Sequence, residues 1–305
     1  MSVLPCMIGT VGAGYQARGV VDECVARGLT AFETADVYGP ERWRHVSDCL
    51  RPNAEVSVKV GLKVDAGGKS AIDSDPESLR STLSELDAMR GESVFESIVL
   101  HRVGDIGFAS SALDMMQKAR RRGVCRKIGV SEVGPATLRN LSTVGEFDFV
   151  ANEVSPFDPP SDEMVSVLKQ SAVKLRPYRV YAGGFWTGRW QRVADVPSRL
   201  RQSGAPRFKA MNLRVNLRRV APARQRAQDL GVPLASVVLS WVSALPEVEM
   251  ITVGLSSRES VRVHASAVTR ASRLTPECVA YVLGSGSYSA AGKRYSRTQM
   301  KLVSE

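Results

Sequence analysis

The chain has 305 residues, and 44% of them are hydrophobic, which is enough to bury a substantial core. Its formal net charge is +10 at pH 7. The five cysteines are scattered without a CxxC pair, and the first residues lack the basic start and apolar core of a signal peptide. These features argue against a disulfide-framed secreted domain, a zinc site and a membrane anchor, and they predict a soluble, cytoplasmic protein with reduced thiols.

Short apolar runs alternate with amphipathic stretches along the chain. Eight of these runs are predicted strands: Cys6–Thr10, Ala31–Thr34, Val56–Gly61, Ser97–His101, Lys127–Val130, Phe149–Val154, Arg179–Ala182 and Met250–Val253. Strands that alternate with helices form parallel sheets, and eight of them in about 250 residues are typical of a closed barrel. We therefore predict an α/β protein, a (β/α)8 TIM barrel. No low-complexity linker or repeat divides it, so a single domain over residues 1–305 is expected.

The helices between these strands carry start and stop signals. Residues 75–77 (DPE) combine an N-cap, a proline at the first helical position and an early acid, and leucines follow at the spacing of a buried helix face. A second helix is predicted over Ser110–Arg122, where basic residues fill the last turn before Gly123.

The positive charge is concentrated between Lys174 and Arg226, where fourteen basic residues accompany one acid, Asp195. The first interpretation is a solvated, arginine-rich surface. The second is a site that attracts an anionic substrate or a cofactor phosphate. Nucleic acid is the least favoured partner, because no aromatic residues are interleaved with the bases and no nucleic-acid motif is present.

Three residues at predicted strand ends can meet at one mouth of the barrel, where reacting groups of such folds lie. Tyr38 follows the second strand, Lys59 lies toward the end of the third, and His101 closes the fourth. A phenol has an ordinary pKa near ~10, and a neighbouring ammonium lowers it. With an imidazole to orient a carbonyl oxygen, this set suits proton delivery to a carbonyl while a nicotinamide supplies hydride.

Eight segments over roughly residues 5–270 follow one another in a recognisable order. They are MIGTVGAG, FETADVYGPE, VSVKVG, IVLHRV, KIGVSE, GFWTGR, VPLASVVLSWV and ITVGLSSRESV. Each is a weak signal alone, but in this order and spacing they closely resemble the motifs of the aldo-keto reductases. The resemblance implies a (β/α)8 barrel and an NAD(P)H-dependent oxidoreductase that reduces an aldehyde or ketone.

The resemblance also implies catalytic roles. Tyr38 is the expected general acid, Lys59 the partner that lowers its pKa, and His101 the group that orients the carbonyl. Glu33 occupies the position of the family's aspartate, and we expect it to pair with Lys59 despite its extra methylene. Asp36, on the following turn, is the alternative partner.

Further residues correspond to the family's nicotinamide site. Ser131 lies in the Gly-Val-Ser stretch, Glu132 stands where the family has asparagine, and Asn152 where it has glutamine. Both of the latter positions normally hold the carboxamide. A carboxylate there can accept from the amide nitrogen, but it cannot donate to the carbonyl oxygen unless it is protonated. Tyr181 matches the tyrosine that stacks on the nicotinamide ring.

The phosphate-binding residues are expected in two loops. Gly183 and Gly184 would let the backbone approach a pyrophosphate. After the last predicted strand, Ser256, Ser257 and Arg258 are candidates for a 2′-phosphate. The resemblance therefore favours NADP(H) as the cofactor, with NAD(H) as the alternative.

The expected substrate is a small-molecule carbonyl compound or alcohol, such as a sugar-like compound or a biosynthetic intermediate. One alternative is a diverged nucleotide-binding barrel of low catalytic activity with a sensory or regulatory role. Another is a barrel enzyme outside redox chemistry. No metal, nucleic-acid or membrane partner is expected. Residues that select the substrate are expected in the loop Ala182–Met211 and in the C-terminal tail, 274–305, near the substrate pocket.

Overall fold

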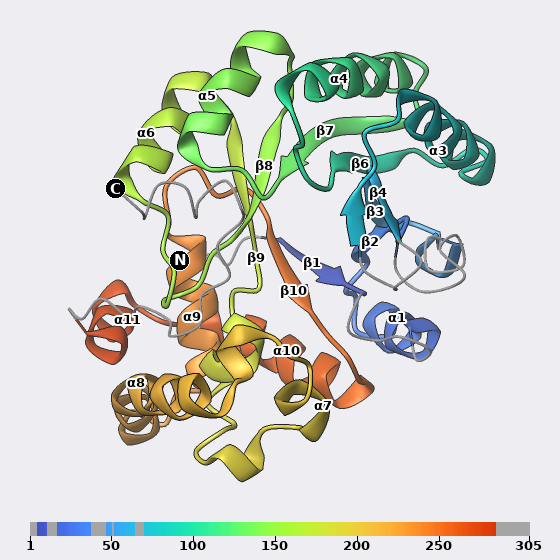
Figure 1. Cartoon of the computed structure of the whole chain (residues 1–305). Coiled ribbons are helices and arrows are strands. Elements are labelled where there is room, and N and C mark those ends of the chain that lie inside the picture. The colour runs from blue at the N-terminus through green and yellow to red at the C-terminus, as the bar shows by residue number, and fades with distance from the viewer. Residues whose placement is uncertain (1–4, 11–16, 38–46, 51, 65–69, 285–305) are drawn as a thin grey trace.

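The computed structural model describes residues 5–10, 17–37, 47–50, 52–64 and 70–284 (Figure 1). Eight parallel strands close into a barrel in the order β1, β10, β9, β8, β7, β6, β3, β2. Their bounds are β1 Cys6–Gly9, β2 Ala31–Ala35, β3 Glu55–Val60, β6 Phe95–Leu100, β7 Cys125–Ser131, β8 Phe149–Glu153, β9 Lys174–Tyr178 and β10 Ile251–Gly254. A separate antiparallel hairpin pairs β4 (Leu62–Val64) with β5 (Ser70–Ile72). The predicted (β/α)8 barrel is confirmed.

Seven of the eight barrel strands lie within a few residues of their predicted positions. The exception is the seventh strand in chain order. The prediction of a strand over Arg179–Ala182 was wrong, because β9 runs over Lys174–Tyr178. The segment KLRPY contains two bases and a proline, a composition that is not typical of a buried strand. It is buried nonetheless because Arg176 finds acidic partners inside the barrel. Arg179 then has φ +52, which ends the strand.

Helices surround the barrel, with α3 to α6 on one side of it and α8 to α11 on the other (Figure 1). Their bounds are α1 Ala17–Val25, α3 Pro76–Met89, α4 Ile106–Arg121, α5 Pro135–Val144, α6 Asp162–Ser171, α7 Ser198–Arg201, α8 Ala210–Asp229, α9 Leu234–Ser243, α10 Arg258–Ala271 and α11 Pro276–Leu283. Short 3-10 helices lie between β9 and α8 at η2 Ala182–Thr187, η3 Val193–Asp195 and η4 Pro206–Phe208.

The predicted helix signals are largely correct. The Asp75 carboxylate caps α3 by accepting from the backbone N–H of Glu77 at 3.0 Å. The helix predicted from Ser110 begins a turn earlier, at Ile106, because Asp105 caps it through the N–H of Phe108 at 2.9 Å. The described part of the C-terminal tail forms α11, which packs on α8 and α9.

Two apolar regions hold the fold together. The larger lies between the strands and the helices, and it includes most of α9. The smaller lies inside the barrel, where Val99, Phe149 and Ala151 pack together with Tyr178 against them. Phe149 fills this level so closely that a Cβ on Gly129 would lie 2.4 Å from its ring. The barrel interior is therefore a packed core, with its polar groups above and below.

Below this apolar level, toward the amino-terminal ends of the strands, Arg176 is 2% exposed. Its guanidinium donates to both carboxylate oxygens of Glu96 at 2.8 Å and to Glu249 at 2.6 Å. It also lies 3.5 Å from the centre of the Phe149 ring. These contacts satisfy a charge that would otherwise be strongly unfavourable in the barrel interior.

Candidate active site

Glu33 and Lys59 meet inside the barrel near its carboxyl-terminal mouth. They lie on the adjacent strands β2 and β3, where Ala35 is level with Lys59 and Glu33 with Ser57. The Lys59 ammonium is 3.0 Å from Glu33 Oε1, and the residues are 4% and 7% exposed. The hydroxyl of Thr252, on β10, donates to Glu33 Oε2 at 3.5 Å. The longer acid thus reaches the lysine, as expected.

His101 directly follows β6, the strand next to β3. Its backbone N–H donates to Val60 O at 2.8 Å, which places it at the same end of the barrel as Lys59. Burial, followed by the charges of Lys59 and Arg102, holds the pKa of His101 well below its usual value. The imidazole is therefore neutral at neutral pH, and a neutral ring can donate one N–H to an oxygen.

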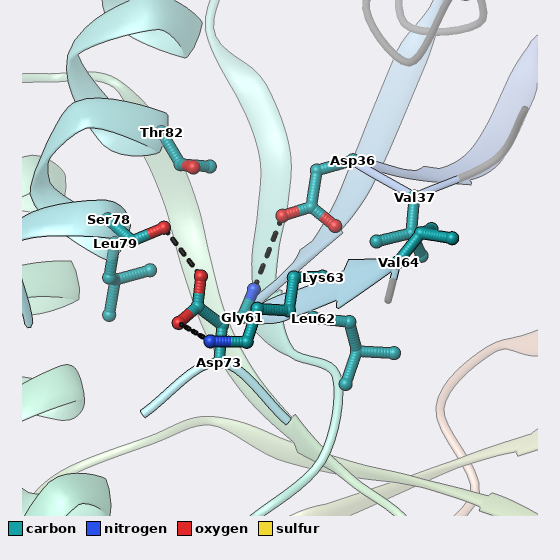
Figure 2. A pocket seen from close by; sticks show the side chains of 10 residues that line it. All are labelled: Asp36, Val37, Gly61, Leu62, Lys63, Val64, Asp73, Ser78, Leu79 and Thr82. Atoms are coloured by element: carbon teal, nitrogen blue, oxygen red, sulfur yellow. Dashed lines mark hydrogen bonds and ion pairs between the residues drawn. The ribbon is translucent and has the colours of Figure 1, made fainter. Parts of the chain in front are cut away.

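Tyr38 lies outside the described residues. The chain two residues before it is anchored at the end of β3. The Asp36 backbone N–H donates to Lys59 O at 3.0 Å, and its carboxylate accepts from the Gly61 N–H at 3.3 Å (Figure 2). Asp36 is therefore held beside the lysine strand by its own set of bonds.

A pocket of about 270 Å³ begins at Asp36 and extends between the β4–β5 hairpin and the start of α3 (Figure 2). Its polar side is organised by Asp73. That carboxylate accepts from Ser78 Oγ at 2.6 Å and from Lys63 Nζ at 3.4 Å. Leu62 and Val64 line the apolar side. The pocket thus offers a half-apolar, half-polar wall beside the barrel mouth.

Tyr178, the last residue of β9, is a mouth residue that the sequence did not single out. Its ring centre lies 4.7 Å from Lys59 Nζ, and its hydroxyl donates to Glu132 at 3.2 Å. Burial, and then the charge of Glu132, raises the pKa of Tyr178 well above its usual value. The hydroxyl therefore stays protonated. A correct end for the seventh strand would have been the signal that identified it.

Tyr181 lies three residues further on, at the start of η2. Its hydroxyl is 3.4 Å from Nδ1 of His264, on α10. The tyrosine that sequence reasoning assigned to the nicotinamide ring thus contacts an outer helix, while Tyr178 lies in the barrel interior against Lys59.

The three residues expected at the nicotinamide site, Ser131, Glu132 and Asn152, are bonded within the protein. Ser131 Oγ donates to Ala151 O at 3.0 Å. The Asn152 amide accepts from Val133 N at 3.1 Å and donates to Val133 O at 2.7 Å. Glu132 pairs with Arg102 at 2.9 Å. The structure brings these side chains together at the ends of β7 and β8, with their described polar contacts directed to the protein.

Gly183 and Gly184 lie in η2 with φ +75 and +115. A Cβ on Gly184 would lie 2.5 Å from the Trp190 ring, so only glycine fits beneath that side chain. Phe185 stacks on Phe208 in the same cluster. The glycines thus have a packing reason as well as the backbone freedom expected of a phosphate loop.

The turn between β10 and α10 gathers polar groups suited to an anion. The N–H groups of Ser256 and Ser257 both donate to Ser260 Oγ, and Ser257 caps α10. Arg199, on α7, donates to Ser256 Oγ at 2.9 Å. The Arg258 guanidinium lies on α1 at Gly19. Hydroxyl and guanidinium donors of this kind fit a phosphate. Arg199 lies in the long loop after β9, and only folding brings it to this turn.

Three residues near the same end of the barrel have left-handed backbone. Glu132, Arg179 and Ala182 have φ values of +60, +52 and +50, although none of them is glycine. They lie at the ends of β7 and β9 or just beyond. Left-handed backbone at non-glycine residues is uncommon and concentrates at functional sites. Asn53, Ala172 and Glu247, which precede β3, β9 and β10 at the opposite end of the barrel, also have positive φ, so such backbone occurs at both ends.

The basic segment is less of a free charged surface than its composition suggested. Acids from other parts of the chain neutralise several of its bases. The pairs are Lys174–Glu247, Arg176–Glu96, Arg179–Glu153, Arg189–Glu259 and Arg207–Glu153. Five of its fourteen bases are therefore paired in this way; Lys174 and Arg176 lie in β9, and Arg179, Arg189 and Arg207 lie in the loop that follows it.

Two features are absent from the described residues. No cluster of three or more histidine, cysteine, aspartate or glutamate side chains there could hold a metal ion. Within the same ranges, no helix combines the length and apolarity needed to cross a bilayer.

A closed parallel barrel with an ion-paired lysine and a histidine at its carboxyl-terminal mouth is the architecture of a barrel enzyme. The profile of the Aldo/keto reductase family matches residues 13–283. The chain therefore belongs to this family of oxidoreductases, as the motifs predicted.

Relatives extend this result. The chain is 25% identical over 233 residues to "Probable aldo-keto reductase 1" of Glycine max, a match that covers 73% of this chain and 66% of the relative. Among solved structures, an aldo-keto reductase of Bacillus halodurans in its holo form has a TM-score of 0.73 at 18% identity, covering 96% of this chain and 94% of that one. A glycerol dehydrogenase of Gluconobacter oxydans has a TM-score of 0.76 at 18% identity, with coverages of 96% and 95%. These two likenesses show the fold.

Proposed function

We propose that this protein is an NAD(P)H-dependent carbonyl reductase, or the alcohol dehydrogenase of the reverse direction, with Tyr38 as the general acid. The observation that carries the proposal is the buried Lys59–Glu33 pair of 3.0 Å beneath the mouth, with His101 directly after the next strand, β6. A lysine inside a barrel is costly unless its charge is paired. Its presence there is readily explained by a need to stabilise a phenolate.

Each residue has a defined task in carbonyl reduction. The Tyr38 hydroxyl gives its proton to the carbonyl oxygen, and the Lys59 ammonium favours the phenolate that remains. Neutral His101 donates an N–H to the same oxygen and so orients the carbonyl. Tyr38 follows Asp36 by two residues, and Asp36 is bonded to the end of the lysine strand, which supports this assignment. A bound nicotinamide supplies the hydride.

The phosphate side of a dinucleotide fits this chain better than the carboxamide side does. Ser256, Arg199 and Arg258 would hold a 2′-phosphate, and we therefore propose NADP(H) over NAD(H). The ring platform is better assigned to Tyr178 than to Tyr181, because the Tyr178 ring lies in the barrel interior. A structural neighbour solved in its holo form is consistent with nucleotide binding.

The test is an assay in which the oxidation of NADPH or NADH is monitored by its absorbance at 340 nm. The panel holds aliphatic and aromatic aldehydes, ketones and sugar aldehydes. Glycerol and other polyols are assayed with the oxidised cofactors, because one structural neighbour is a glycerol dehydrogenase. NADPH consumption with at least one carbonyl, lost in Tyr38→Phe, is the expected result. Turnover that survives this change would refute the Tyr38 assignment.

A second candidate is a nucleotide-binding barrel of low activity with a sensory or regulatory role. The observation that favours it is the engagement of Ser131 and Asn152 in bonds within the protein. Calorimetry decides between the two. Nucleotide binding without turnover on any member of the panel would favour this second candidate.

A further inference from the structure

Glu132 stands at the end of β7 with both carboxylate oxygens bonded to protein side chains. Oε2 accepts from Nε of Arg102 at 2.9 Å, and Oε1 accepts from the Tyr178 hydroxyl at 3.2 Å. Arg102 follows β6, and Tyr178 ends β9. A single carboxylate therefore links groups from both sides of β7 and β8 across the mouth.

The backbone at Glu132 is held in an uncommon conformation. Its φ is +60, a region in which asparagine and glycine are favoured over glutamate. Asn152 stabilises the turn from the next strand, because its side-chain amide pairs with both the N–H and the C=O of Val133. The Glu132 N–H also donates to Ala151 O at 3.0 Å. The Asn152 side-chain amide thus bonds the Val133 backbone as a residue of a neighbouring strand would.

The Tyr178 ring is the element on which these bonds act. Tyr178 packs against Val99, Phe149 and Ala151. The centre of its ring lies 4.7 Å from Lys59 Nζ. An aromatic face near an ammonium stabilises the charge. Lys59 is therefore supported by the Glu33 carboxylate and by this ring. The hydroxyl bond to Glu132 fixes the far end of the ring.

We propose that Glu132 is a positioning residue that holds the Tyr178 ring beside Lys59, and that Asn152 fixes the turn from which Glu132 acts. Neither side chain then contacts the nicotinamide carboxamide, the role that the family resemblance implied for them. The inference rests on the proposed function in one respect, that Lys59 acts in proton transfer.

The decisive experiment is a double-mutant cycle with Glu132→Asn and Tyr178→Phe. Asparagine suits the left-handed backbone but is a methylene too short for the present contacts. Phenylalanine keeps the ring and removes the bond. The exposed Glu163, paired with Arg139 at 2.9 Å, supplies the control variant Glu163→Gln. Kd for the nucleotide is measured by calorimetry, and kcat is measured at 340 nm.

If Glu132 acts through Tyr178, each single variant lowers kcat by about tenfold and the double variant is no slower than the slower single one. Asn152→Asp, which loses the donor to Val133 O, should lower kcat in the same direction. Independent, multiplying effects of Glu132→Asn and Tyr178→Phe overturn the proposal. So does a Glu132→Asn variant that binds the nucleotide tenfold more tightly, because the family's asparagine would then have restored a ligand.

A measurement without cofactor separates this inference from the proposed function. In protein labelled with 13C-tyrosine, the Tyr178 ring resonance is assigned by its loss in Tyr178→Phe. It should shift in Glu132→Asn and in Lys59→Met, and stay in place in Glu163→Gln. A resonance unmoved by Glu132→Asn overturns the positioning role. Absence of turnover in the wild type would refute only the proposed function. The shift of the Tyr178 resonance would still test the positioning role of Glu132.

Discussion

The Lys59 ammonium and the Glu33 carboxylate are 3.0 Å apart inside the barrel, and less than a tenth of either side chain is exposed. In the strand register Glu33 is level with Ser57, one inward position below Lys59. The longer acid spans this step and still reaches Thr252. The extra methylene of glutamate is therefore part of the geometry that neutralises the lysine.

Removing the Glu33 charge should destabilise the protein. Glu33→Gln leaves a buried ammonium without its counter-ion, so the free energy of unfolding should fall by about 3–5 kcal/mol in urea titrations. The exposed pair of Glu163 with Arg139 gives the control, because Glu163→Gln should change the free energy of unfolding by less than about 1 kcal/mol. Glu33→Asp should lower both stability and turnover. An aspartate variant that is as stable and as fast would show that acid length is irrelevant.

Tyr38→Phe removes only the transferable proton. Carbonyl reduction should slow by about 10²- to 10⁴-fold, the usual contribution of a positioned acid. Nucleotide affinity should stay within about twofold, since the ring remains. Single-turnover kinetics and calorimetry on the same preparation check both parts. Strongly weakened nucleotide binding would indicate that Tyr38 acts in binding, in disagreement with this prediction.

Arg199 should discriminate between the two cofactors. Its donor group lies 2.9 Å from Ser256 Oγ, at the turn proposed for the 2′-phosphate. A charged contact is worth roughly 1.5–3 kcal/mol, so Arg199→Gln should weaken NADPH binding about tenfold or more and leave NADH nearly unchanged. Arg258→Ala is measured beside it. An equal loss for both nucleotides, from either variant, would mean that the arginine in question is structural.

Two partly or fully buried histidines should make stability pH-dependent. Burial lowers the pKa of His264 from 6.5 to about 4, and the pKa of His101 is also held low. Below pH 6.5 these histidines are protonated in the unfolded chain but stay neutral in the folded protein. The free energy of unfolding therefore falls toward pH 4. For His264 the full loss is roughly 3 kcal/mol.

The measurement is urea unfolding at pH 7 and at pH 4.5. Carboxylates also titrate in this range, so the wild type is compared with His264→Gln at each pH. The variant should lose less stability on acidification. Parallel pH dependences of the two proteins would show that His264 takes its proton as readily in the folded state as in the unfolded one.

Arg176 should be required for folding stability. Arg176→Met strands the carboxylate of Glu96, which is 6% exposed, and the cost should be about 3–5 kcal/mol. Adding Glu96→Leu removes the uncompensated charge, so the double variant should recover part of this loss. Denaturant titrations of the three proteins give the answer. A single variant within about 1 kcal/mol of the wild type would mean that the interior pair contributes little.

Local patterns were sufficient for most of the fold. Alternating apolar runs predicted the barrel because strands covered by helices on a closed sheet must be apolar on both faces. The cap at Asp75 could be predicted since it depends on residues adjacent in the chain. For the same reason Lys59 and His101 were assigned to the mouth from their places at strand ends.

By itself, then, the sequence determined the family, the eight-stranded barrel and the charged groups at its mouth. Tertiary structure decided which partners those groups have. β9 is a strand because Arg176 meets Glu96, eighty residues away. Tyr178 belongs to the site because its ring reaches Lys59 on closure of the barrel. The physical reason is the same in both cases: a local pattern reports the preference of one residue for burial or a turn, whereas a buried charge is tolerable only beside a partner, and that partner is selected by the three-dimensional register of the strands.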